Sequence, residues 1–372
     1  MDPQRPSLLV IFGAGASFDS ADADSTTAIP LPLAIHLVAP GFSQISQKYP
    51  PAQPIIDRLR RRLARGHGAT SLESEMALLA NNGSPDRRGQ MMAFRFYLHD
   101  VIQTTAEKWL AAHFGYTRYL TLFDEIAEWR QQTQARVDVV TFNYDLLVEQ
   151  ALASVVPDWA FGGDLRDYVN RPDFRLFKLH GSTQWSRPVN VTELAAKLGR
   201  GIHPLVGQST LPAAIQMAAA GISLAGLPIE LVRPEAKFDG SSPVMRIPAL
   251  AIPVEGKMDF ECPPAHVDIL KAALPDLTHV LIIGWRGAEQ HAIKLLEGEG
   301  IGDGLMPGYA LGIVSDSGEH ATETRMNLGT PGARGRQILT VDSGFKGLIE
   351  DELRTLDNFL RCSWPEAVTA NS

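Results

Sequence analysis

Cysteine is scarce in this chain, and its scarcity excludes two common kinds of structural support. The 372 residues include only Cys262 and Cys362. Two cysteines cannot supply the four thiolates of a structural zinc site, and they cannot form a framework of several disulfides. We therefore expect a fold that holds no structural metal.

Long apolar segments are also absent. No run reaches the length of about 20 residues that a membrane-spanning helix needs, and residues 1–6 lack the pattern of a signal peptide. We therefore expect a cytoplasmic protein that does not associate with a membrane. With 45% hydrophobic residues, a chain of this length can still bury a substantial core.

Positively charged residues are fewer than negatively charged ones, and the net charge at pH 7 is -8. A surface that binds nucleic acid needs concentrated positive charge, so we expect no strong direct binding of DNA or RNA. A helix predicted over residues 54–65 is a local exception, because it carries Arg58, Arg60, Arg61, Arg62 and Arg65. A basic stripe would suit nucleic acid, but a solvated helix face or a protein contact is the commoner use of such a pattern.

The most informative segment that is present lies near the start of the sequence. Residues 8–12 are an apolar run of strand-forming residues, followed by Gly13, Ala14, Gly15, Ala16 and Ser17. A buried strand that runs into small residues is typical of a turn whose main-chain N–H groups approach a diphosphate. The usual dinucleotide fingerprint has a third glycine, which is missing here. Taken alone, the segment fits a tight turn at a sheet edge equally well.

Polar residues also follow two later apolar runs. Asn143 and Asp145 come after residues 137–142, and His180 comes after residues 174–179. In open α/β sheets, ligands bind outside the carboxyl ends of the strands. We therefore expect these polar residues and the glycine turn to face one crevice.

Strand-like and helix-like patterns alternate along much of the chain. Further strands are predicted over residues 245–253, 280–284, 309–314 and 337–341, and a closing helix over residues 344–360. This alternation is typical of a parallel sheet with right-handed crossovers. We predict an α/β fold with a Rossmann-like parallel sheet, helices on both of its faces and a helical insertion.

We expect a single nucleotide-binding domain over residues 1–372. Helical periodicity from about residue 45 to residue 135 predicts an inserted helical layer. Residues of about 190–245 are rich in small side chains and form a variable region, and the polar residues 19–28 suggest a mobile lid over the nucleotide.

Three motifs occur in a characteristic order: Gly-Ala-Gly-Ala-Ser at 13–17, Thr-Phe-Asn-Tyr-Asp at 141–145, and His-Gly at 180–181. With these motifs the chain resembles the sirtuin-like (silent information regulator two) family. It is most similar to the bacterial antiphage-defence NADase branch, whose members are HerA-, Argonaute- or Thoeris-associated. Residues 281–285 resemble a later strand of that branch, although Arg286 stands where the branch usually has serine.

The resemblance implies a modified Rossmann fold that takes NAD+ as its substrate. It assigns catalysis to Asn143, His180 and Asp145. An asparagine amide suits a ribose hydroxyl or an attacking water, and a histidine can accept a proton near neutral pH. Nucleotide contacts are assigned to Gly13, Ala14, Gly15, Ala16, Ser17, Thr141, Phe142, Gly284, Trp285 and Glu289.

The predicted function is that of an NAD+ glycohydrolase, which cleaves NAD+ to ADP-ribose and nicotinamide and depletes NAD+ in antiphage defence. The alternatives are an NAD-dependent protein deacylase and a catalytically silent nucleotide sensor. The deacylase is disfavoured because sirtuin deacetylases carry a zinc ribbon of four cysteines. The silent sensor is disfavoured because Asn143 and His180 are both present.

No sensor segment is recognisable beside the nucleotide-binding motifs. We therefore expect control by assembly into a homo-oligomer or by a partner. The resemblance implies a HerA-type ATPase as this partner, with an Argonaute-type protein as the alternative. The arginine-rich helix and the long amphipathic patterns over residues 92–109 and 119–129 are candidate assembly surfaces.

Overall fold

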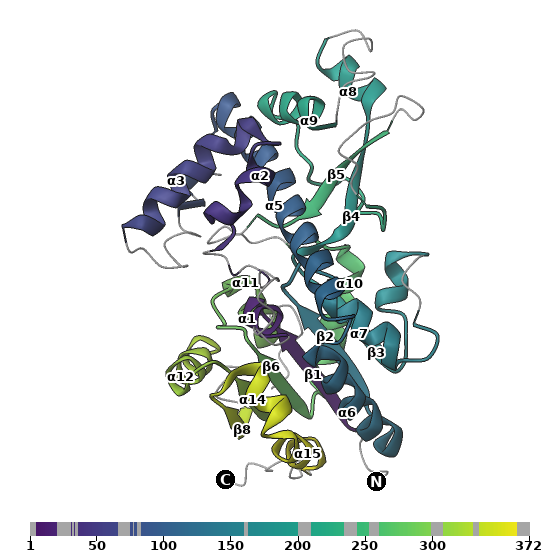
Figure 1. The fold of residues 1–372 in the computed structure, drawn as a ribbon. Coiled ribbons are helices and arrows are strands. Elements are labelled where there is room, and N and C mark those ends of the chain that lie inside the picture. The colour runs from purple at the N-terminus through teal and green to yellow at the C-terminus, as the bar shows by residue number, and fades with distance from the viewer. Residues whose placement is uncertain are drawn as a thin grey trace, which may run out of the picture. The chain divides into compact units, whose positions relative to one another are not determined.

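The computed structural model describes most of the chain (Figure 1). The described residues are 5–20, 31, 33, 36–65, 75–76, 78–79, 83–159, 163–199, 210–233, 244–252, 260–298, 308–329 and 335–362. Contacts group the chain into two compact units. The first unit comprises Met1–Leu31, Lys108–Leu179 and Cys262–Ser372, and the second comprises Pro32–Glu107 and His180–Glu261.

These units bear on the predicted insertion and lid. Residues 45–107 of the predicted helical layer fall in the second unit, whereas residues 108–135 fall in the first. The predicted variable region of residues 190–245 falls in the second unit. Of the segment predicted as a lid, residues 21–28 lie outside the described residues.

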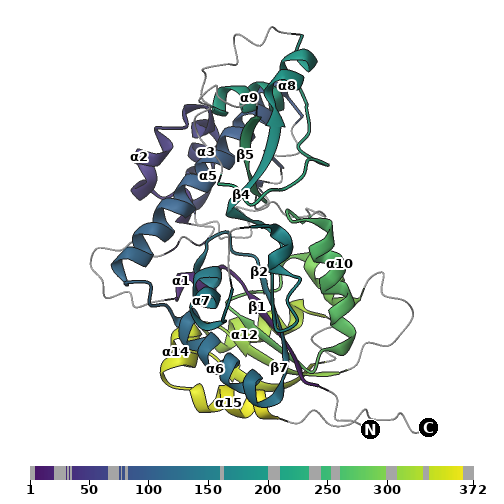
Figure 2. The same ribbon diagram turned by 90° about the vertical axis from the view of Figure 1, so that its right-hand side faces the viewer.

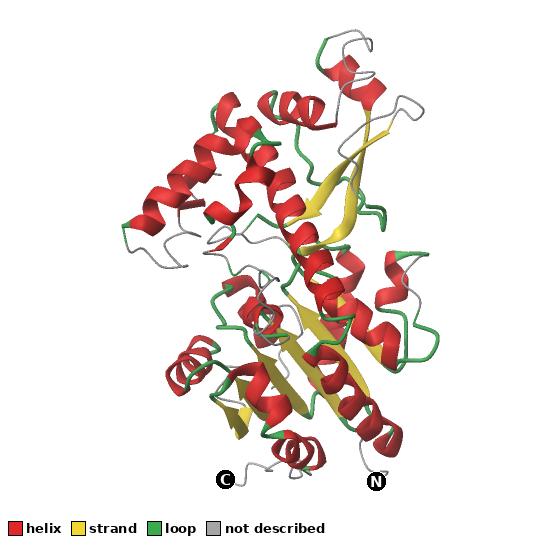
Figure 3. Ribbon diagram, in the orientation of Figure 1, coloured by secondary structure: helices red, strands yellow, loops and turns green. Residues whose placement is uncertain are grey.

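The first unit is built on a six-stranded sheet with the order β3-β2-β1-β6-β7-β8 (Figure 3). All neighbouring strands in it are parallel. Numbered within this sheet alone, the order is the 3-2-1-4-5-6 arrangement of a Rossmann fold. The predicted Rossmann-like parallel sheet is therefore confirmed. Its strands are β1 (Ser7–Phe12), β2 (Arg136–Thr141), β3 (Phe174–Lys178), β6 (His279–Ile283), β7 (Tyr309–Val314) and β8 (Gly335–Val341).

Strand β1 is central in this sheet. All six of its residues are buried, and it pairs with β2 on one side and β6 on the other. Such unbroken apolar runs are typical of parallel strands that are covered on both faces. Because β1 lies between β2 and β6, the residues that follow these three strands emerge side by side at the carboxyl edge of the sheet.

Helices cover both faces of the sheet (Figure 2). Helix α6 packs with α7, α14 and α15 on one face, and α10 lies on the other. The helix predicted over residues 344–360 is in fact two helices, α14 and α15, which are divided at Asp351 and Glu352. The helices of this unit are α1 (Ala14–Phe18), α6 (Arg118–Thr133), α7 (Leu147–Val155), α10 (Pro264–Ala273), α11 (Gln290–Glu297), α12 (Gly318–Asn327), α14 (Gly344–Glu350) and α15 (Leu353–Arg361).

The second unit holds a two-stranded antiparallel sheet of β4 (Gly181–Asn190) and β5 (Val244–Leu250). The strand predicted over residues 245–253 therefore exists, but its assignment to the parallel sheet is wrong. Its partner β4 escaped prediction because Pro188 and several polar residues interrupt its pattern. The helices here are α2 (Ser43–Ser46), α3 (Gln53–Ala64), α5 (Pro85–Ala112, of which residues 108–112 belong to the first unit), α8 (Val191–Lys197) and α9 (Thr210–Ala219).

The arginine-rich helix α3 uses most of its guanidinium groups within the second unit. Arg58 and Arg62 both pair with the buried carboxylate of Glu75. The side chain of Arg60 donates to the carbonyl of Val38 at 2.7 Å. The stripe is thus largely engaged in folding, which weakens the case for a basic binding surface. Among all the described residues, no helix is both long and apolar enough to cross a membrane.

Candidate functional site

The glycine turn after β1 is held against the loop that follows β6. The N–H of Gly13 donates to the carbonyl of Ile283 at 3.0 Å, and the N–H of Gly15 donates to the carbonyl of Gly284 at 3.1 Å. Ala14 is exposed at the start of α1, and no described residue accepts its N–H. Of the main-chain groups predicted to hold a diphosphate, Ala14 therefore offers the accessible donor.

The glycines of this turn are required by the closeness of the two backbones. A Cβ on Gly13 would lie 2.4 Å from the carbonyl oxygen of Gly284. Gly284 has a φ of +63°, and its own Cβ would lie 2.2 Å from the nitrogen of Ala16. Neither position admits a larger residue without moving backbone. The predicted nucleotide-binding residues Gly13, Gly15, Ala16 and Gly284 thus form one packed cluster.

Asn143, which follows β2, points its amide nitrogen into this cluster. Nδ2 donates to the carbonyl of Gly13 at 2.9 Å and to Ser17 Oγ at 2.8 Å. The main-chain N–H of Asn143 donates to Thr141 Oγ1 at 3.0 Å. A carbonyl oxygen can only accept, so the contact with Gly13 identifies the inward amide atom as nitrogen. The sequence placed Asn143, Thr141 and the glycine turn at one sheet edge, and the structure brings them together.

Ser17 turns its hydroxyl into the protein. Its Oγ lies 3.0 Å from the hydroxyl of Tyr119 on α6 and accepts from Asn143. Both Ser17 and Tyr119 are buried. Burial, reinforced by the negative charge of Asp145, raises the pKa of Tyr119 well above its ordinary value, so the phenol stays protonated. Here the serine orders the site, and its predicted contact with a diphosphate stays a prediction.

Tyr119 is a site residue that the sequence did not reveal. It occupies an amphipathic stretch together with Leu122, Phe123 and Ile126, and all four side chains are fully buried. At that spacing an aromatic residue is expected to be simple core. The one sequence signal for a role beyond the core was its hydroxyl, because a buried tyrosine hydroxyl normally needs a hydrogen-bond partner.

Two aromatic rings meet at the same sheet edge. Phe142 follows β2 and Trp285 follows β6, and their rings stack with centroids 5.0 Å apart and planes 22° apart. The indole N–H of Trp285 donates to the carboxylate of Glu289. Burial raises the pKa of Glu289 despite this hydrogen bond. The structure thus brings Phe142, Trp285 and Glu289 together, three residues that the resemblance assigned to the nucleotide.

Asp145 organises the chain that leaves β2. Its Oδ1 accepts the N–H of Leu147 at 3.1 Å, so the carboxylate supports the first turn of α7. Its main-chain carbonyl accepts from the ammonium of Lys178. Lys178 is fully buried at the end of β3, and its ammonium lies 2.9 Å from a carboxylate oxygen of Glu149 on α7. This ion pair was missed by the sequence prediction, and burial raises the pKa of the Glu149 carboxyl even beside the lysine.

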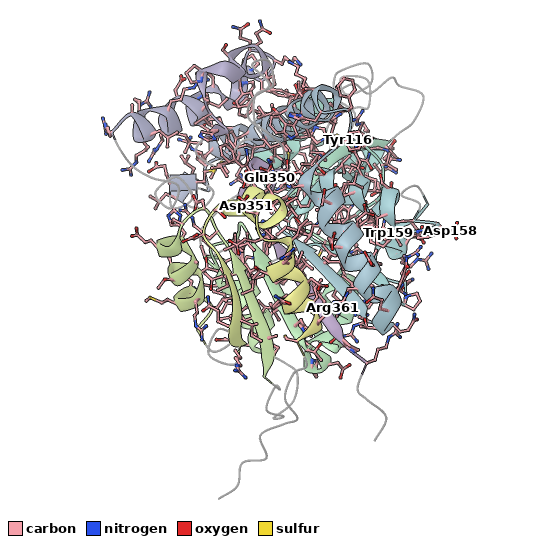
Figure 4. All side chains as sticks on the ribbon, turned by 60° about the horizontal axis from the view of Figure 1, so that its bottom comes forward. Tyr116, Asp158, Trp159, Glu350, Asp351 and Arg361 are labelled. Atoms are coloured by element: carbon pink, nitrogen blue, oxygen red, sulfur yellow. The ribbon has the colours of Figure 1, made fainter. Side chains whose placement is uncertain are left out.

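The C-terminal end of α1 is anchored by contacts with Arg118 on α6 and with the start of α14. The main-chain N–H of Arg118 donates to the carbonyl of Ser20 at 2.7 Å, and Arg118 Nη2 lies 2.7 Å from the carboxylate of Glu350. Glu350 lies at the end of α14 (Figure 4). The carboxylate of Asp19 accepts the N–H of Lys346 at 2.8 Å. The contacts made by Ser20 and Asp19 fix the C-terminal end of the short helix that carries Ser17.

His180 lies in the turn between β3 and β4 and belongs to the second unit. Its carbonyl accepts the N–H of Ala251 at 2.8 Å. The next residue, Gly181, has a φ of +87°, and a Cβ there would lie 2.0 Å from the carbonyl oxygen of Ala249. The backbone of His180 and Gly181 is therefore held closely against residues 249–251. His180 does follow the end of β3, as the sequence predicted, whereas its role as a general base stays a prediction.

Metal-binding groups are not evident in the described part of the chain. No cluster of three or more His, Cys, Asp or Glu side chains there is arranged to hold an ion. Cys262 is buried and Cys362 is half-buried, and neither forms a disulfide. The groups brought together around the glycine turn are the amide of Asn143, hydroxyls, main-chain groups, aromatic rings and the carboxylate of Glu289.

Three solved structures of Sir2 homologues are similar to this chain in the path of the backbone. A point mutant in complex with ADP-ribose matches with a TM-score of 0.43 and 11% identity, over 96% of this chain and 95% of that one. A triple mutant with 2′-O-acetyl ADP-ribose and another point mutant with ADP-ribose each match with a TM-score of 0.39 and 12% identity, over the same shares. No protein-family profile matches the sequence, and a search of curated proteins found no match. The Rossmann-like assignment rests on the strand order, not on these similarities.

Proposed function

We propose that this protein binds NAD+ and hydrolyses the bond between nicotinamide and ribose. The observation that carries the proposal is the orientation of Asn143. Its amide nitrogen is bound within the protein by Gly13 and Ser17, and no group in the described residues donates to its Oδ1. An acceptor is thereby presented beside a glycine turn at the carboxyl edge of a Rossmann-type sheet, where nucleotides are expected to bind.

The reaction needs little covalent assistance from the protein. Water attacks C1′ of the nicotinamide ribose, the C1′–N bond breaks, and its electron pair neutralises the nicotinamide ring. The attacking water loses one proton, which we assign to His180 as acceptor on the strength of its sequence motif. Such cleavage passes through an oxocarbenium-like state, so positioning and electrostatics supply most of the acceleration.

Incubation of the purified protein with NAD+ tests the proposal directly. Chromatography should show nicotinamide and ADP-ribose in equal amounts, with NAD+ alone as substrate. A parallel reaction with an acetylated peptide distinguishes the deacylase, which would require the peptide and form O-acetyl-ADP-ribose. Binding of NAD+ without any turnover would instead support a silent sensor.

We further propose that the protein depletes NAD+ in antiphage defence and works as a homo-oligomer under the control of a partner. The motif resemblance to the defence branch supports this role, with a HerA-type ATPase as the first candidate and an Argonaute-type protein as the second. Light scattering of the pure protein tests assembly, and NAD+ turnover with and without co-expressed genomic neighbours tests control. A fully active, unregulated monomer would contradict this part of the proposal.

A further inference from the structure

We infer that Tyr119 is a positioning residue, which holds the amide of Asn143 in one orientation so that its Oδ1 accepts from a hydroxyl or water of the ligand. The role in catalysis rests on the proposed function, whereas the orientation of the amide does not. The hydroxyl of Tyr119 acts through Ser17 and Asn143.

The hydrogen bonds around Asn143 can be assigned one by one. Its amide nitrogen carries two protons, and one of them goes to the carbonyl of Gly13. The other goes to Ser17 Oγ at 2.8 Å, with Tyr119 OH a more distant acceptor at 3.4 Å. Ser17 Oγ and Tyr119 OH share a third hydrogen bond at 3.0 Å. Asn143, Ser17 and Tyr119 thus form one connected, buried hydrogen-bond network.

Tyr119 is itself held rigidly. Its ring is fully buried and packs edge-on against Phe12 and Phe345, with centroids 4.9 Å and 5.3 Å away. The phenol is therefore held away from the protein surface, with Ser17 and Asn143 as its hydrogen-bond partners. In such a buried network, removing one hydroxyl frees the neighbouring groups to adopt other orientations.

This arrangement limits the ligand group that Asn143 can bind. With both amide protons directed inward, the side chain offers only a carbonyl-type oxygen. It can therefore accept from a ribose hydroxyl or from water, but it cannot donate to a phosphate or to the nicotinamide carbonyl. Asn143 thus selects a hydroxyl donor.

Tyr119→Phe tests the inference, because it removes the hydroxyl and keeps the ring. Tyr97→Phe is the matched control: Tyr97 is also fully buried, and its hydroxyl donates to the carbonyl of Leu37 at 2.7 Å. The first readout is independent of activity. In protein labelled with ¹⁵N-asparagine, the side-chain amide signal of Asn143, identified by its loss in Asn143→Ser, should exchange slowly in the wild type and in Tyr97→Phe.

In Tyr119→Phe we expect exchange of this amide to be about 10-fold faster or more, because its network is opened. Unchanged exchange would overturn the inference, whether or not the protein hydrolyses NAD+. For the active enzyme we also expect kcat to fall about 10-fold, with ADP-ribose affinity within about twofold of the control. A wild type that neither binds ADP-ribose nor cleaves NAD+ would contradict the proposed function alone, since the exchange result would still stand.

Discussion

The side-chain amide of Asn143 donates to the carbonyl of Gly13 across 2.9 Å, so the loop that follows β2 is tied to the first residue after β1. The two strands are neighbours in the sheet, and the hydrogen bond ties their carboxyl ends together. The same amide reaches Ser17 on α1. The turn and the strand end therefore behave as one rigid group, which is the arrangement expected of a site that must position a ligand.

Replacing either proposed catalytic residue should abolish most NAD+ cleavage. We expect His180→Ala to lower kcat about 10²–10⁴-fold, as loss of a general base does, and Asn143→Ala to lower it about 10²-fold or more. His113→Ala, just after α5, is the matched control, because His113 belongs to none of the three motifs and its ring packs against Trp109. Near-normal turnover in His180→Ala would show that another group accepts the proton.

Gly284→Ala should destabilise the protein more than Gly115→Ala. Both glycines have positive φ, +63° and +78°, which costs an alanine about 1–2 kcal/mol. At Gly115 nothing lies within 4 Å of the added Cβ, whereas at Gly284 the nitrogen of Ala16 lies 2.2 Å away. We therefore expect a loss of about 3 kcal/mol or more for Gly284→Ala, measured by urea unfolding. Equal losses for the two variants would refute the close contact between the loops.

Lys178→Met should be strongly destabilising. It would leave Glu149 buried without its partner, at an expected cost of about 3–5 kcal/mol. The double variant Lys178→Met, Glu149→Leu should recover much of this loss, because no buried charge remains. Arg361→Met serves as the control, since its pair with Asp357 lies at the surface and is worth at most about 1 kcal/mol. Additive losses in the double variant would argue against a coupled pair.

Stability should fall as the pH is lowered from about 6.5 to about 4, and His279 should be one cause. Burial lowers the pKa of His279 to about 4 in the folded protein, against an ordinary value of 6.5. Between these values the unfolded chain binds the proton and the folded chain does not, so acid favours unfolding by about 3 kcal/mol in total.

Urea unfolding across this pH range checks the prediction. His279→Gln should flatten the dependence of the unfolding free energy on pH, whatever its effect on stability at pH 7. His266→Gln should have a similar effect, since burial also lowers the pKa of His266 to about 4. A slope unchanged by both substitutions would mean that the two imidazoles are charged in the folded state.

The sequence predicted the parallel sheet of the first unit better than the two-stranded sheet of the second. The apolar runs before Gly13, Asn143 and Gly284 form strands that are buried on both faces of the sheet. Such strands can be found from the sequence, because they are short continuous runs of apolar, strand-forming residues. The strand β4 was not found, because it pairs with a segment distant in the sequence and Pro188 interrupts its pattern.

Tyr119 and Lys178 escaped prediction for a different reason. A buried polar side chain is explained only by its partner, and the partners here come from other elements: Ser17 on α1 and Glu149 on α7. Lys178 did carry a signal, since it lies within an otherwise apolar run and a lysine there requires a buried carboxylate or carbonyl. The sequence alone does not say which one.

The close contact of Gly13, Gly15 and Gly284 bears on how this turn can change in evolution. Gly13 and Gly284 are closed to a larger residue by the backbone of the other loop, and a Cβ on Gly15 would lie 3.0 Å from that backbone. A substitution in the turn is therefore tolerated only when the loop after β6 is remodelled with it. Insertions or deletions near Gly284 should therefore accompany changes at residues 13–16 in related sequences, so that these two distant stretches of sequence co-vary.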